Sequence, residues 1–143
     1  MGLATAIARV QTLVGALSGM KGAPSKMPDK LHSFPFSVAY PGAGTWAMAY
    51  MGGAAIQDTG QIVIDLHLCS QDKGVAAAMD ALGDYFETLP KALAADETLD
   101  GNITDQGMGP QIIVHDGLLA LTYAGIDTYA CRWRLNYERE ETL

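Results

Sequence analysis

Three side chains of types that bind metals occur at alternate positions between residues 65 and 69. Asp65, His67 and Cys69 belong to one predicted strand, and alternate residues of a strand share a face. With Cys131 or His115 close by, they would supply mixed oxygen, nitrogen and sulfur ligands. No Cys-x-x-Cys or His-Glu-x-x-His spacing accompanies them. We therefore favour an ordinary polar strand face and predict neither a metal nor a cofactor.

Three acidic residues follow at spacings of four and three. Asp80, Asp84 and Glu87 share one face of a predicted helix, opposite its apolar stripe. Carboxylates perform acid–base catalysis when one of them is desolvated and its pKa rises. A face opposite the buried stripe is expected to be solvated instead. These residues predict an acidic surface, which would line the channel if the chain formed a ring.

Other signatures of enzymes are missing from the sequence. It contains no G-x-G-x-x-G, no Walker A pattern and no G-x-S-x-G. The run Pro41-Gly42-Ala43-Gly44 is typical of a turn. We therefore predict a protein without catalytic residues.

Composition points to assembly. A chain of 143 residues is the size of one domain, which we assign to residues 1–143, with residues 137–143 expected to form a loose tail. Hydrophobic residues make up 49% and charged residues 17%, so some apolar surface is expected to be covered by an oligomer or a partner. The net charge of −7 argues against a protein that grips nucleic acid, because phosphate contacts require clustered Lys and Arg.

The sequence also predicts an intracellular chain that does not cross a membrane. Two cysteines are too few for a disulfide framework, which favours a reducing compartment. No charged n-region precedes the first apolar residues, and Arg9 interrupts them. Residues 31–57 carry no Asp, Glu, Lys or Arg, but prolines and glycines break this run too often for a spanning helix.

Hydrophobic periodicity predicts an α+β domain with the order α-β-β-β-α-(β)-β-β, in which helices pack on one face of a mainly antiparallel sheet. The first helix has its apolar stripe at Leu3, Ile7, Val10, Val14 and Leu17. The second helix, capped by Ser70 or Asp72, has its expected buried stripe at Val75, Met79, Leu82 and Phe86. The expected strands are 34–40, 45–51, 61–69, 118–123 and 126–137, with 99–108 as a loop or weak strand and a hairpin turn at Ala124-Gly125.

The predicted strand 45–51 carries no charge on either face. Trp46, Met48 and Tyr50 alternate with Ala47, Ala49 and Met51. Either a central strand covered on both sides or an edge covered by a neighbouring subunit explains this pattern. For the second alternative, the predicted contact residues are Trp46, Met48, Tyr50 and Met51.

The C-terminal half resembles a known class of proteins. The runs concerned are Leu89-Pro90-Lys91-Ala92-Leu93 with Ala95-Asp96, Leu99-Asp100-Gly101-Asn102-Ile103, Leu121-Thr122-Tyr123-Ala124-Gly125-Ile126-Asp127 and Cys131-Arg132-Trp133-Arg134-Leu135. Over residues 61–137 the chain is similar to neck proteins of long-tailed bacteriophages (siphoviruses), of the tail-terminator or head-to-tail joining kind.

The resemblance implies a structural virion protein without catalytic residues. Such subunits close into a hexameric ring that caps the tail tube, joins it to the head through head-closure or connector proteins, and lets DNA pass without specific binding. It implies a location in the virion neck, and in the host cytoplasm during assembly. Two other hypotheses remain from the residues alone: a small dimeric ligand-binding or regulatory domain, and a metal-dependent enzyme using Asp65, His67 and Cys69.

Overall fold

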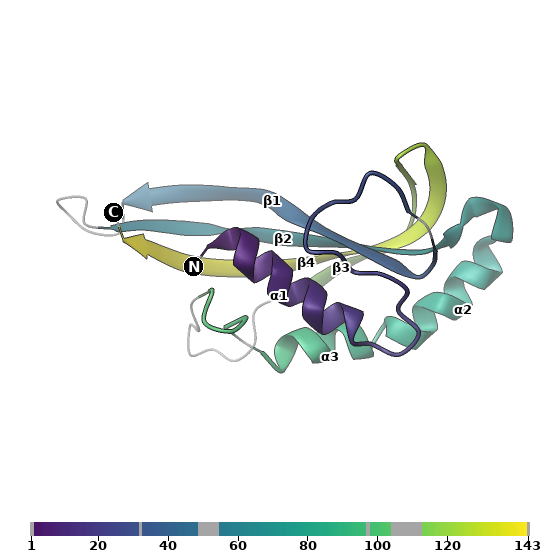
Figure 1. Ribbon diagram of the computed structural model, residues 1–143, viewed down its shortest axis with the longest axis horizontal. Helices are drawn as coiled ribbons and strands as arrows, with labels where there is room; N and C mark the ends of the chain where they lie inside the picture. The colour runs from purple at the N-terminus through teal and green to yellow at the C-terminus, as the bar shows by residue number, and fades with distance from the viewer. Residues whose placement is uncertain (1, 32, 49–54, 97, 104–112, 143) are drawn as a thin grey trace.

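The structure is a computed structural model that describes residues 2–31, 33–48, 55–96, 98–103 and 113–142. Its elements are α1 (Leu3–Gly15), β1 (Phe36–Met48), β2 (Ala55–Ser70), the 3-10 turn η1 (Gln71–Lys73), α2 (Val75–Tyr85), α3 (Thr88–Ala94), β3 (Ile113–Tyr123) and β4 (Ile126–Thr142). The four strands form one antiparallel sheet in the order β1-β2-β4-β3, and the helices lie against one of its faces (Figure 1). The predicted α+β class and the order of its elements are confirmed.

The main core lies between the helices and the sheet. Ile62, Ile64 and Leu66 of β2 are fully buried there, as their alternation predicted. The face that α1 presents to them includes Val10 and Val14, both at 0% exposure. The helical period of three and four therefore matches the strand period of two across one apolar layer.

The opposite face of the sheet, which the sequence predicted to be the polar face of the strand 61–69, is also covered. Val63, Asp65 and His67 are 5%, 6% and 1% exposed. The connection between α1 and β1 crosses to this face, where Leu31 packs in a second apolar cluster with Phe36 and Val38. A connection that covers a sheet has no helical or strand period, so the sequence pattern did not show it.

Residues 41–44 do not form the predicted turn. The expected strands 34–40 and 45–51 are joined in β1, and the register with β2 shifts between Pro41 and Gly44. A Cβ on Gly44 would come within 2.7 Å of the Thr59 carbonyl oxygen, so glycine permits the close approach of the two strands. The Pro-Gly pattern therefore marks a β-bulge, at which the strand continues.

The second predicted helix is present, but the expected buried stripe was wrong. Of its four residues only Leu82 is buried, while Val75, Met79 and Phe86 are 52%, 52% and 42% exposed. The side chains that face the core are instead Ala78, Leu82 and Tyr85. The buried Tyr85 donates a hydrogen bond to the Ser18 carbonyl oxygen at 2.8 Å, so its polar end is satisfied. The N-cap of α2 is Gly74, which follows η1, and neither Ser70 nor Asp72 occupies that position.

The C-terminal residues are not a loose tail. β4 extends to Thr142 and pairs with β2 along its length, Thr142 lying opposite Ala55. The hairpin turn at Ala124-Gly125 is confirmed, since β3 ends at Tyr123 and β4 begins at Ile126. Both turn residues have positive φ, at 51° and 79°, as a type I′ turn requires. Residues 98–103 form turns, and the remainder of the expected loop 99–108 lies outside the described residues.

Candidate functional site

Three strands continue past the N-terminal end of α1, at the end of the molecule away from α2 (Figure 1). We call residues 44–48 of β1, 55–60 of β2 and 137–142 of β4 the strand extension. Trp46 pairs with Asp58, and Asp58 pairs with Arg139 on the next strand, so the three side chains share one face. Among the described side chains of this surface, Trp46 is the exposed large apolar one, at 59% exposure.

Beneath Trp46 lies a buried ion pair. The Nε of Arg139 donates to Oδ2 of Asp58 at 2.8 Å, and the hydroxyl of Tyr137 donates to the same oxygen at 3.0 Å. The Arg139 guanidinium carbon lies 5.4 Å from the centroid of the Trp46 ring, within cation–π range. Burial, with the hydrogen bond to Asp58, raises the pKa of Tyr137 to about 12, so its hydroxyl remains a donor.

The exposed ring of Trp46 lies over the buried ion pair of Asp58 and Arg139. Trp46 covers the ion pair with one side and presents the other to solvent, which is the geometry of a binding anchor more than that of a core residue. β1 is an edge strand of the sheet. Of the predicted contact residues, Trp46 lies on the extension and Met48 ends β1, while Tyr50 and Met51 lie outside the described residues.

The predicted acidic face is exposed and spans two helices. Asp80 and Asp84 lie on α2, and Glu87 is the N-cap residue of α3. Nζ of Lys91 lies 3.7 Å from Oε2 of Glu87, with both side chains almost fully solvated. These carboxylates are not desolvated, so the geometry gives them no role in acid–base catalysis.

Part of the acidic face borders an open pocket of about 460 Å³ that the sequence did not predict. Its lining includes Met79, Leu82, Asp84, Phe86 and Glu87, and we call it the acidic pocket. The apolar side chains Met79 and Phe86 are those that the expected stripe had placed in the core. The surface therefore combines an apolar lining with a negative rim, which suits a partner with apolar and basic side chains.

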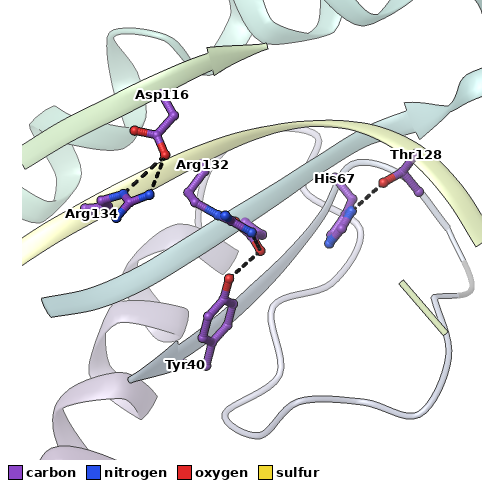
Figure 2. Close-up of polar contacts among 7 residues, drawn as sticks. Tyr40, His67, Asp116, Thr128, Arg132 and Arg134 are labelled. Carbon is purple, nitrogen blue, oxygen red and sulfur yellow. Dashed lines mark hydrogen bonds and ion pairs between the residues drawn. The ribbon is translucent and has the colours of Figure 1, made fainter. Parts of the chain in front are cut away.

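Two of the residues considered for a metal site, Asp65 and His67, use their polar atoms in contacts within the fold, and Figure 2 shows His67 beside Thr128. Asp65 accepts two hydrogen bonds from Arg132, at 2.8 and 3.1 Å, and one from the Tyr40 hydroxyl at 2.8 Å. These bonds occupy both carboxylate oxygens. Burial and the bond to Asp65 raise the pKa of Tyr40 to about 12, so this phenol stays neutral.

The other members of that set face different surroundings. Nδ1 of His67 lies 2.7 Å from the Thr128 hydroxyl, whereas Cys131 lies in the helix-side core. Cys69 follows a register shift in β2, and His115 packs against Phe86. In the parts of the chain that the structure describes, no group of three His, Cys, Asp or Glu is placed to hold a metal ion.

The helices of the described ranges include none that is long and apolar enough to cross a membrane. No protein-family model matches the chain. A search of curated proteins likewise finds no significant match.

Proposed function

We propose that this chain is a structural subunit of a bacteriophage neck, a tail terminator or head–tail connector that forms a hexameric ring around a channel for DNA. The proposal extends the resemblance carried by residues 61–137. The observation that carries it is Trp46, exposed on a strand extension that projects beyond the helices. Contact with a neighbouring protein would cover the indole ring of Trp46 and shield the Asp58–Arg139 ion pair beneath it.

The acidic net charge of the chain supports a channel through which DNA passes without binding. Six subunits at −7 each would carry a charge of −42 (6 × −7), which disfavours adhesion of DNA to the inner wall. The acidic face with Asp80, Asp84 and Glu87 would lie on the side of the subunit toward that wall. The alternative of a small dimeric ligand-binding domain has weaker support, because the acidic pocket is open and bordered by solvated carboxylates.

A tube-growth assay tests this function. The tail-tube protein of the same phage, polymerised with and without this chain, would be compared by electron microscopy. We expect the chain to form a ring at one tube end and to stop further growth there, while a Trp46→Ser variant loses the ring. Growth that continues unchanged, with no density at either end, would remove the proposal.

A further inference from the structure

The connection from α1 to β1 presents a second exposed apolar side chain. Met27 is 52% exposed in the segment 21–30, which we call the lysine loop because it contains Lys21, Lys26 and Lys30. Asp29 is the one acidic residue of this segment, so its net charge is +2. Within the described residues, all four arginines form ion pairs with carboxylates, whereas none of these three lysines does.

Hydrogen bonds on both sides of Met27 fix the loop. The buried Gln11 side chain donates to the Pro24 carbonyl oxygen at 2.8 Å, and the Tyr123 hydroxyl donates to the Pro28 carbonyl oxygen. Further along, Leu31 is buried in the second apolar cluster. Met27 is therefore held in place by residues of α1 and of β3, which lowers the entropy lost when it binds a partner.

The lysine loop and the acidic pocket complement each other. One has an exposed Met between lysines, and the other has an apolar lining bordered by Asp84 and Glu87. A pocket of about 460 Å³ has room for a flexible Met side chain together with the stem of a neighbouring Lys. The matching of apolar and charged groups favours contact between them.

The two surfaces belong to different parts of one subunit. The acidic pocket is formed by α2 and the start of α3 on the helix side of the sheet, while Leu31 carries the loop onto the opposite face. One copy can therefore use both surfaces at once, on two different neighbours. A contact of this heterologous kind generates a closed ring when its rotation closes.

We propose that the lysine loop of each subunit docks in the acidic pocket of the next copy, with Met27 as its anchor. This inference rests on the proposed ring and identifies one of its contacts. Asp84 and Glu87 then face the neighbouring subunit, which leaves Asp80 of the acidic face for the channel wall.

A mixing experiment with Met27→Asp and Met79→Asp tests the contact. Both side chains are half exposed, so the substitutions change little inside the monomer. Each variant alone should associate about 30-fold more weakly or worse, as expected when an interface anchor is lost. Mixed together, they should form dimers and no larger species, because the intact loop of the Met79→Asp chain can bind the intact pocket of the Met27→Asp chain only once.

Native mass spectrometry would read the species, and Val114→Asp is the matched control. Val114 is 44% exposed on β3, outside both surfaces, and its variant should assemble as the wild type does. Reversing the charges with Lys26→Glu and Lys30→Glu should weaken assembly, and adding Asp84→Lys and Glu87→Lys to the same chain should restore it.

Two results overturn the inference in distinguishable ways. If the wild type forms rings and both Asp variants still form them, or if their mixture yields no dimer, the contact is wrong while the ring stands. If the wild type stays monomeric, alone and with tail-tube protein, the proposed function fails and the contact fails with it.

Discussion

Replacing Arg139 by methionine would remove the cation that balances the buried Asp58 carboxylate. The two side chains are 9% and 3% exposed, and Tyr137 would remain as a hydrogen-bond donor to Asp58. Removing one partner of a buried ion pair typically costs about 3–5 kcal/mol, because the other charge is left uncompensated. With an m-value of about 2 kcal/mol per molar urea, the midpoint of unfolding should fall by about 2 M.

Urea unfolding followed by circular dichroism would measure this loss. Adding Asp58→Asn to Arg139→Met removes the stranded charge and should recover about 2 kcal/mol. Lys91→Met is the matched control, because the Lys91–Glu87 pair is 78% and 79% exposed and its loss should change stability by less than about 0.5 kcal/mol. In a Trp133→Phe background, the fluorescence of Trp46 would report the extension alone, since the chain has two tryptophans.

A cost of less than about 1 kcal/mol for Arg139→Met, the range of an exposed pair, would contradict this prediction. A double variant Asp58→Asn, Arg139→Met that is no more stable than Arg139→Met would contradict it as well. Either result would mean that water reaches Asp58 and that the ion pair does not support Trp46.

Three further predictions concern groups inside the fold. Burial lowers the pKa of His67 below 6.5, so the unfolded chain binds a proton more readily than the folded chain does. The free energy of unfolding should therefore be highest above pH 6.5 and fall as the pH drops through the folded-state pKa of His67. Unfolding measured at several pH values should show that a His67→Asn variant loses this dependence. Burial raises the pKa of Cys131 to about 11, so a thiol reagent at pH 8 should label the half-buried Cys69 first and Cys131 only on unfolding; equal rates for the two would contradict the burial. Gln11→Ala removes bonds to the Pro24 and Ser37 carbonyl oxygens and should destabilise the chain by about 2–4 kcal/mol in thermal unfolding, whereas a change below about 0.5 kcal/mol would show that the lysine loop is not held this way.

The hydrophobic period of the sequence and the chemistry of its turns were sufficient to predict the fold class. The alternation of Ile62, Ile64 and Leu66 and the helical spacing of Ile7, Val10 and Val14 both mark buried faces in the structure. The buried face of a helix is harder to predict when apolar residues cover more than one of its faces, because the hydrophobic period alone does not show which face meets the sheet. In α2, Ala78 and Tyr85 take the core positions and Met79 and Phe86 are left outside.

The candidate surfaces depended on contacts between distant residues. Trp46 and Arg139 are far apart in sequence, and they meet because β2 pairs with both β1 and β4. The alternation of Arg132 and Arg134 with Trp133 indicated in part that ion pairs cross the sheet, since arginines in a strand need nearby acidic partners. Those partners are Asp65 and Asp116. The sequence offered no such signal for the lysine loop, whose position is set by bonds from Gln11 and Tyr123.

Native mass spectrometry of the wild-type chain, alone and with its tail-tube protein, would show whether the chain forms a ring. We expect a closed species of six 15.2-kDa chains, about 91 kDa (6 × 15.2 kDa), in at least one of the two samples. Monomers or dimers alone in both samples, at every concentration measured, would contradict it.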